Sequence, residues 1–214
     1  MSLHLKAWTR PDQGALFVVT GASGTGKTTL VREALRVVPD VDWSVSVTTR
    51  APRAGERDGV DYHFVDRARF EALRDSGALL ESAEVYGNGY GTPRAPVESA
   101  LAEGRSVLLE IDLAGARQVR QRFPAMIGIF VLPRSLADLN TRLRGRATDS
   151  EEIIARRIRE AHSQIAGCGE FEYLVVNDDL STAHDCFQAV LVAELQRASR
   201  RASLVTTMTS SPAP

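Results

Sequence analysis

A glycine-rich segment near the N-terminus has the residue types that bind phosphate groups. Residues 21–28 read Gly-Ala-Ser-Gly-Thr-Gly-Lys-Thr, in which two glycines five apart are followed by lysine and threonine. This is the P-loop pattern. Glycines let the backbone curl so that successive N–H groups converge on phosphate oxygens, and the partial positive charge of a helix N-terminus adds attraction. The predicted nucleoside-triphosphate site consists of Gly21, Ala22, Ser23, Gly24, Thr25, Gly26, Lys27 and Thr28.

Lys27 and Thr28 have separate chemical tasks in such a site. The ammonium group is a compact charge for the β- and γ-phosphates, and the threonine hydroxyl suits the coordination of Mg²⁺. Of the 26 basic residues only Lys6 and Lys27 are lysines, so an arginine-rich chain keeps lysine where a non-planar cation is wanted. We therefore predict Lys27 as a catalytic residue, Thr28 as the metal ligand and Mg²⁺ as the cofactor.

The elements on either side of this segment are those that position a phosphate-binding loop. Residues 15–20 form a short apolar run rich in β-branched side chains, which predicts a buried strand. The residues after the loop place apolar side chains on one helical face, at Leu30, Val31, Ala34 and Leu35. Strand, glycine loop and helix thus follow in the order that the motif needs.

Composition and charge exclude several classes of function. The 214 residues are 43% hydrophobic and 25% charged, with a formal net charge of −1 and a pI near 6.4. Such a chain has no overall basic field for nucleic acid or an anionic membrane. Cys168 and Cys186 fit no zinc or redox spacing, so we expect free thiols in a reducing compartment. Without a membrane-length apolar run or a signal-peptide pattern, we expect a cytoplasmic protein; the oligomeric state stays open.

Strands and helices alternate along most of the chain, which predicts an α/β fold with a mostly parallel sheet flanked by helices. Between about 44 and 92 the elements are shorter and richer in strands, which indicates a small inserted α+β subdomain. Residues 1–14 are expected to be an N-terminal extension, and the small, polar residues 199–214 a disordered tail. The expected strands are 15–20, 43–47, 62–65, 79–85, 106–111, 126–132 and 172–176, with a tight turn at 87–91; the expected helices are 29–35, 66–73, 113–123 and 180–195, and others begin at 93, 135 and 148.

A second group of residues indicates where a phosphate acceptor binds. Arg50 and Arg53 lie three apart in a polar loop. Tyr62 and Tyr90 follow in the same inserted region. Guanidinium groups pair bidentately with phosphate oxygens, and phenol hydroxyls add hydrogen-bond donors. Each residue alone is better explained as a solvated arginine or a packing tyrosine, but the four together favour a site for an anionic phosphate ester.

The longer sequence around these residues closely resembles the guanylate kinases. Segment 44–65 resembles their GMP-binding segment, and the similarity covers about residues 15–196. It continues in order through Glu81, 87–93, 110–112, 142–146 and 176–180. The resemblance implies a P-loop NTPase-type guanylate kinase-like domain at 15–198, with a core at 15–43 and 93–198, a GMP-binding insert at about 44–92 and an arginine-rich lid at about 140–160. It also implies phosphoryl transfer from ATP to GMP, giving ADP and GDP.

The resemblance implies a role for each matching residue. The GMP-binding residues would be Ser46, Arg50, Arg53, Tyr62, Glu81, Tyr90, Thr92 and Asp112. The catalytic residues would be Lys27, Arg50, Arg142, Arg146 and Arg157, whose charges neutralise the transferring phosphoryl group. Asn177 would complete the ATP-binding set at the edge of the adenine pocket. For Arg144 and Arg156 we favour the plainer interpretation of a solvated basic helix face.

Elementary chemistry agrees with the role of Glu81. Guanine presents N1–H and N2–H side by side, and one carboxylate accepts both hydrogen bonds, whereas adenine has an unprotonated N1 at that place. A buried carboxylate facing adenine is left partly unpaired, which costs about 1–3 kcal/mol. The alternative for Glu81 is a solvated strand residue.

Two other functions stay open on the sequence alone. A P-loop kinase of another small phosphate ester, such as a sugar bisphosphate, would be expected to lack Ser46, Glu81 and Asp112. A non-catalytic guanylate kinase-like interaction module would be expected to lack a working P-loop. The chain also departs from the usual family pattern at Gly89, where an aromatic residue is common, and we expect a looser turn there.

Overall fold

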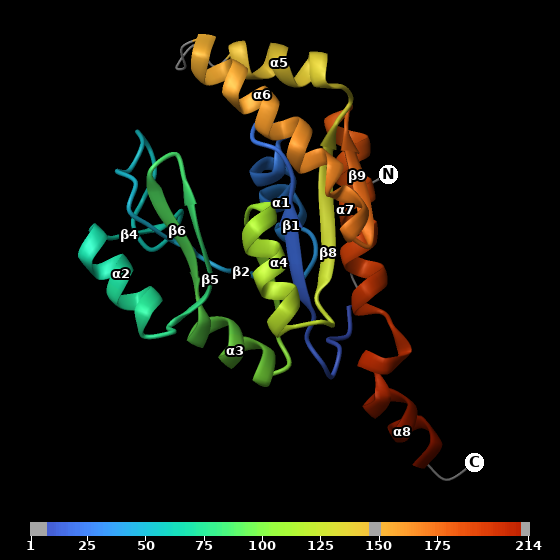
Figure 1. Cartoon of the computed structure of the whole chain (residues 1–214). Coiled ribbons are helices and arrows are strands. Elements are labelled where there is room, and N and C mark those ends of the chain that lie inside the picture. The colour runs from blue at the N-terminus through green and yellow to red at the C-terminus, as the bar shows by residue number, and fades with distance from the viewer. Residues whose placement is uncertain (1–7, 146–150, 211–214) are drawn as a thin grey trace.

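The strands form two separate sheets in the computed structural model, which describes residues 8–145 and 151–210 (Figure 1). Five parallel strands make the core sheet in the order β2-β7-β1-β8-β9, and four make the second sheet in the order β4-β3-β6-β5. The strands of the core sheet are β1 (Leu16–Thr20), β2 (Val41–Trp43), β7 (Ser106–Glu110), β8 (Ile127–Pro133) and β9 (Tyr173–Asn177). Those of the second sheet are β3 (Val47–Thr48), β4 (His63–Phe64), β5 (Leu79–Val85) and β6 (Asn88–Pro93).

Helices cover both faces of the core sheet. The helices of the described residues are α1 (Lys27–Leu35), α2 (Arg67–Asp75), α3 (Arg94–Ala102), α4 (Leu113–Arg122), α5 (Leu136–Arg144), α6 (Glu151–Ala166), α7 (Leu180–Leu195) and α8 (Ala202–Ser210), with 3₁₀ turns at Cys168–Glu170 and Ala198–Arg200. Phe17 and Val19 of β1 pack with α1 and α7 on one face. Leu16 and Val18 pack with α3 and α4 on the other. A parallel sheet buried on both faces confirms the predicted α/β class.

The second sheet, with α2, stands beside the core sheet, and α5 and α6 lie above one end of both (Figure 1). The second sheet and α2 have a small apolar core of their own, which consists of Val47, Phe70 and Leu79. Among the described residues, none of the helices combines the length and apolar character needed to cross a membrane.

One predicted strand, 43–47, is divided between the two sheets. Trp43 ends β2 beside β7 of the core sheet, whereas Val47 begins β3, which pairs with β4 and β6. The alternating pattern over these residues is the same on both sides of the division, so local sequence does not reveal where the chain changes sheet. The crossing is decided by the partner strands.

The predicted tight turn at 87–91 is wrong. Val85 pairs with Asn88, so the turn between β5 and β6 consists of Tyr86 and Gly87, with φ of 53° and 79°. Two-residue turns of type I′ require positive φ at both positions. Gly89 lies inside β6, where an added Cβ would lie 2.6 Å from the Phe70 ring. The missing side chain is therefore replaced by that ring, and the expectation of a looser turn does not hold.

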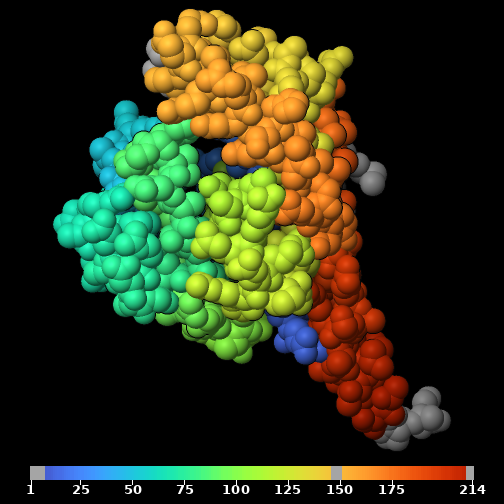
Figure 2. All heavy atoms as spheres, in the orientation of Figure 1, coloured from blue at the N-terminus to red at the C-terminus, as the bar shows by residue number. Residues whose placement is uncertain are grey.

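The end of the chain also differs from the expectation. The sequence predicts no regular structure after residue 198, whereas residues 202–210 form α8, which extends away from the rest of the protein (Figures 1 and 2). Asp12 accepts hydrogen bonds from the backbone N–H of Ser203, at 2.7 Å, and from its hydroxyl. This carboxylate satisfies a free N–H of the first helical turn, as a capping residue does. Local sequence shows no cap there because the acceptor lies 191 residues away in the chain.

Candidate active site

A cavity of about 270 Å³ lies between the P-loop, the second sheet and α6. Figure 2 shows the hollow, with dark blue atoms of the N-terminal part of the chain at its floor. It collects predicted residues from both the donor and the acceptor site: Gly21, Ser23, Lys27, Ser46, Arg53, Tyr62, Glu81, Tyr90, Asp112 and Arg157. Because the P-loop follows β1 and Asp112 follows β7, the cavity opens at the carboxyl ends of neighbouring parallel strands, where ligand sites of α/β folds form.

The P-loop needs its glycines for both conformation and space. Gly21, Gly24 and Gly26 have φ of 140°, 90° and 88°, which side chains rarely adopt. A Cβ on Gly26 would also lie 2.4 Å from the Asn177 amide nitrogen. That amide donates a 2.7 Å hydrogen bond to the Thr25 carbonyl. Asn177 therefore supports the loop from behind with its side chain, a contact that the sequence did not predict.

Lys27 and Thr28 begin α1 directly after the loop. The Lys27 ammonium donates to the carbonyl oxygens of Gly21, at 2.6 Å, and Ala22, at 3.0 Å, and so lies over the loop and against the cavity. The Thr28 hydroxyl donates to Glu110 Oε1 at 2.7 Å. A hydroxyl and a carboxylate side by side are the hard oxygen ligands that Mg²⁺ prefers, so these residues fit that ion. No group of three or more potential metal ligands occurs in the part of the chain that the structure describes.

Glu81 is a buried carboxylate at the wall of the cavity. Glu81 is 4% exposed. Its Oε1 accepts a 2.7 Å hydrogen bond from the hydroxyl of Thr92, which pairs with Glu81 across β5 and β6. Burial raises the pKa of Glu81 to about 7, and the nearby charge of Asp112 adds to the rise. Asp112 is held by the Gly115 N–H at 2.7 Å, as the N-cap of α4. Two carboxylates thus converge on one pocket, which favours a ligand rich in hydrogen-bond donors.

The phosphate-binding group predicted for the acceptor is assembled around the Tyr62 ring. The guanidinium carbon of Arg50 lies 5.4 Å from its centroid, and the Tyr90 ring 6.0 Å. Burial, and then the charge of Glu110, raises the pKa of Tyr62, so the phenol remains a hydrogen-bond donor at neutral pH. Arg50 also donates to Glu56 at 2.8 Å, which lowers the pKa of that carboxyl. Arg53 lines the cavity, while Arg50 stands behind Tyr62.

Comparisons with known proteins agree with this geometry. The family model described as guanylate kinase matches residues 13–194. The chain belongs to the guanylate kinase family. It is 52% identical to a guanylate kinase of Aromatoleum aromaticum over 86% of this chain and 90% of that protein. It is 55% identical to one of Parasynechococcus marenigrum, over 79% and 93%. The crystal structure of guanylate kinase from Anaplasma phagocytophilum superposes with a TM-score of 0.78 at 32% identity, covering 94% of this chain and 97% of that one.

The arginines expected from the guanylate kinase resemblance lie in different places. Arg157 of α6 lines the cavity. Arg142 of α5 donates to the Asn177 carbonyl at 2.8 Å, beside the back of the P-loop. Arg146 lies outside the described residues. Asn177 is 4% exposed and bound on both its amide and its carbonyl, so the structure gives it contacts within the protein, not an open ligand-facing amide.

Among the residues that line the cavity of this guanylate kinase family member, sequence reasoning missed the polar side chains of Tyr86, Glu160 and Gln164. Arg157, Glu160 and Gln164 recur at helical spacing on α6, next to the buried positions Ile154 and Ala161. The helical spacing of these residues beside the apolar positions is the signal in the sequence that could have found Glu160 and Gln164. No comparable sequence pattern indicated Tyr86, because its place in the turn follows from the register in which β5 pairs with β6.

Gly115 was also missed, and it makes room for the Glu81 carboxylate. A Cβ at this position would lie 2.5 Å from Glu81 Oε2 and 3.2 Å from Asp112 Oδ1. We predict that Gly115→Ala raises the KM for GMP about tenfold, since a displaced carboxylate loses about 1–3 kcal/mol of hydrogen bonding. Helix propensity alone would make this substitution stabilising. The control is Gly169→Ala, where a Cβ meets nothing within 4 Å. Steady-state kinetics with an unchanged KM for GMP would contradict the crowding argument.

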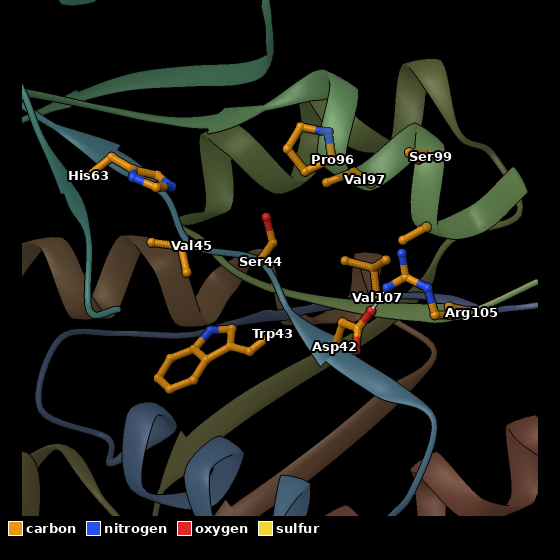
Figure 3. Close-up of a pocket in the computed structure, with 11 residues that line it drawn as sticks. Asp42, Trp43, Ser44, Val45, His63, Pro96, Val97, Ser99, Arg105 and Val107 are labelled. Atoms are coloured by element: carbon orange, nitrogen blue, oxygen red, sulfur yellow. Dashed lines mark hydrogen bonds and ion pairs between the residues drawn. The ribbon is translucent and has the colours of Figure 1, made fainter. Parts of the chain in front are cut away.

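A second cavity, of about 320 Å³, lies where the chain passes between the two sheets (Figure 3). Ser44, between β2 and β3, points toward α3 across it, and Asp42 and Arg105 close one side with an ion pair. None of the described residues predicted for the nucleotide sites lines this cavity. We therefore assign the active site to the cavity beside the P-loop.

Proposed function

We propose that this protein is an ATP:GMP phosphotransferase, which transfers the γ-phosphoryl group of ATP to GMP and gives ADP and GDP. The observation that carries the proposal is the buried Glu81, held by Thr92, in the same cavity as Lys27. Base recognition and phosphate binding thus share one cavity. The family supports the same reaction, because the similar proteins named above are guanylate kinases.

We propose that the P-loop binds the triphosphate of ATP, the phosphoryl donor. The loop backbone and the N-terminus of α1 bind its phosphates, and Lys27 leaves its two carbonyl contacts to bind the transferring group. Thr28 and Glu110 would hold Mg²⁺, which would supply positive charge to the phosphates of ATP. Arg142 supports the loop through Asn177, and Arg157 contributes charge inside the cavity.

We propose that the carboxylates of Glu81 and Asp112 bind the guanine base of GMP, the phosphoryl acceptor. Ionised Glu81 accepts hydrogen bonds from N1–H and N2–H, while Asp112 and Ser46 lie in the same cavity for further donors and acceptors of the base. Thr92 holds the Glu81 carboxylate in orientation. An adenine base would leave Glu81 facing an acceptor, and this mismatch selects GMP against AMP.

The acceptor phosphate binds, in the same proposal, between the second sheet and the P-loop. Arg53, Tyr62 and Tyr90 line that part of the cavity, and Arg50 lies against the Tyr62 ring. The attacking oxygen belongs to a phosphate that is already ionised at neutral pH, so the reaction needs positioning and charge neutralisation more than a general base. We further propose that residues 44–92 and the region at 140–160 close together on the substrates and exclude water.

We also propose a cytoplasmic location. The support is chemical: Cys168 and Cys186 are both free, as is usual for cysteines in a reducing compartment. ATP and GMP are small-molecule partners, and a net charge of −1 provides no overall basic field for nucleic acid.

The test of the proposed function is a coupled assay of ADP release. Purified protein receives ATP and Mg²⁺ with GMP, AMP, UMP or CMP in separate reactions. We expect turnover with GMP and, with the other three nucleotides, less than about one hundredth of that rate. Equal turnover with AMP would contradict base recognition by Glu81. No turnover with any nucleotide, from folded protein that binds ATP, would overturn the proposal.

A further inference from the structure

Tyr86 has an unusual backbone conformation at the tip of the β5–β6 hairpin. Its φ of 53° is left-handed, and Asp40 is the one other non-glycine residue with positive φ in the described parts of the chain. Asp and Asn tolerate this region, whereas a bulky side chain there costs about 1 kcal/mol or more. Type I′ turns favour Asn-Gly, yet this turn is Tyr-Gly. Such strain persists where surrounding contacts hold it.

Those contacts join the hairpin to α6. The Tyr86 phenol donates a 2.6 Å hydrogen bond to Glu160 Oε2. The guanidinium carbons of Arg156 and Arg157 lie 4.5 Å and 5.4 Å from the ring centroid, within the range of cation–π attraction. Arg156 also lies 3.7 Å from Glu160 Oε1, which completes a cluster of one ring, two cations and one carboxylate.

The two elements joined by this cluster serve opposite sides of the reaction. The hairpin carries Glu81, Tyr90 and Thr92, while α6 carries Arg157, and all but Thr92 line the one cavity. Figure 2 shows the green hairpin meeting the orange helix at the edge of the hollow. Tyr86 and Glu160 line the cavity too, so the contact lies at the site and not on a remote surface.

We propose that Tyr86 is a positioning residue, which ties the acceptor-binding hairpin to α6 and holds the Arg157 guanidinium in the cavity. This inference rests on the proposed function, because it concerns the acceptor and donor sides of that reaction. An arginine side chain has several rotatable bonds, and a ring on one side of its guanidinium restricts the positions it can take. Burial, and then the hydrogen bond to Glu160, raises the pKa of Tyr86 to about 12, so the phenol remains a donor throughout the neutral range.

The contact between the hairpin and α6 is expected to affect the rate of phosphoryl transfer more than the binding of either nucleotide. Binding of GMP orders the hairpin through Glu81, and the hairpin then places α6 and Arg157 for phosphoryl transfer. Loss of Tyr86 leaves the GMP contacts of β5 and β6 in place but lets Arg157 move. The chemical step slows as a result, whereas the affinity for either nucleotide changes little.

Two variants of Tyr86 separate the ring from the hydroxyl. Tyr86→Phe keeps the ring and removes the bond to Glu160, and we expect kcat to fall about fivefold, as for one lost hydrogen bond. Tyr86→Asn removes both and creates the Asn-Gly pair that type I′ turns favour, so the hairpin is expected to be at least as stable. For Tyr86→Asn we expect kcat to fall about tenfold or more, with both KM values within about twofold.

A third variant tests whether Tyr86 acts through Glu160. We expect Tyr86→Phe combined with Glu160→Ala to lower kcat no further than Glu160→Ala alone, since both remove the same bond. The matched control is Tyr173→Phe, which removes a tyrosine–glutamate hydrogen bond of 2.5 Å to Glu194, away from the cavity, and should leave kcat unchanged. If Tyr86→Asn keeps wild-type kcat, the inference is overturned while the proposed function stands.

Hydrogen–deuterium exchange of the protein without substrates tests the contact between the hairpin and α6 without an activity assay. We expect backbone amides of α6 around Ile154–Ala161 to exchange with deuterium faster in Tyr86→Asn than in wild type, and not in Tyr173→Phe. If wild-type protein fails to phosphorylate GMP, the proposed function fails, and exchange alone then decides the tie between hairpin and helix. Unchanged exchange in Tyr86→Asn would overturn that tie.

Discussion

Lys27→Ala lowers kcat for GMP phosphorylation by about 10³-fold, because removal of one preorganised charge at a transferring group costs about 10²–10³ or more. The ammonium lies between the Gly21 and Ala22 carbonyls and the cavity, so a phosphate entering the loop meets it directly. Lys27→Arg restores the charge but not the rate, since a planar guanidinium does not fit the space of a compact ammonium. Coupled ADP release at saturating ATP and GMP measures both variants.

The control for Lys27 is the residue that follows the same helix. Arg36→Ala also removes one cation from the region of α1, but Arg36 is an exposed residue that pairs with Glu33, outside the cavity. We expect it to keep wild-type kcat. A rate for Lys27→Ala within tenfold of wild type would remove this lysine from the catalytic set.

The second large effect concerns Glu81. Glu81→Gln raises the KM for GMP by about tenfold or more and leaves the KM for ATP unchanged, because one acceptor oxygen becomes an N–H that faces a guanine N–H. The matched control is Glu84→Gln on the same strand, where the side chain is 58% exposed and pairs with Arg67. An equal rise in both KM values would indicate a general disturbance of the fold, not base recognition.

The pH dependence of the same variant gives an independent test. Burial raises the pKa of Glu81 to about 7 in the empty protein, so kcat/KM for GMP rises as this carboxyl ionises through pH 7 and levels off above it. The second ionisation of the GMP phosphate, near pH 6, contributes its own rise. Glu81→Gln keeps the rise near pH 6 and loses the one near pH 7. Identical profiles for the two proteins would contradict the assignment.

Ionising Glu81 also costs the empty protein stability. Its folded pKa of about 7 lies above the ordinary 4.5, so between these values the folded state binds more protons than the unfolded state. The free energy of unfolding therefore falls as pH rises from about 4.5 to about 7, by about 3 kcal/mol in all. In urea denaturation, Glu81→Gln should be the more stable protein above pH 7, and the difference should disappear below pH 4.5.

The P-loop and its neighbours were predictable because every determinant is local. Residues 15–20 alternate between the two buried faces of β1, the glycines supply positive φ, and Leu30, Val31 and Ala34 bury one helical face. The start of a helix at 135 was also predictable, because its cap is local: the Ser135 hydroxyl accepts a hydrogen bond from the Asp138 N–H. Periods of two and 3.6 residues report such features directly.

The acceptor site was harder to predict from the sequence than the P-loop. Ser46, Glu81 and Asp112 come from three elements, and their common cavity follows from the register of β5 on β6 and from the position of β7 in the core sheet. The family resemblance pointed to these residues, but periodicity alone did not. One predicted strand at 43–47 became two strands because partner strands, and not local pattern, decide where a chain changes sheet.

By itself, the sequence determined the α/β class and the phosphate-binding loop, since these depend on spacing along the chain, while its resemblance to the guanylate kinases pointed to the residues of the acceptor site. Only the tertiary structure decided that Gly115 leaves room for Glu81, that Asn177 supports the P-loop and that Tyr86 meets Glu160. The last two contacts join residues 152 and 74 positions apart. Contacts over such separations depend on packing between whole elements, and no local period in the sequence encodes them.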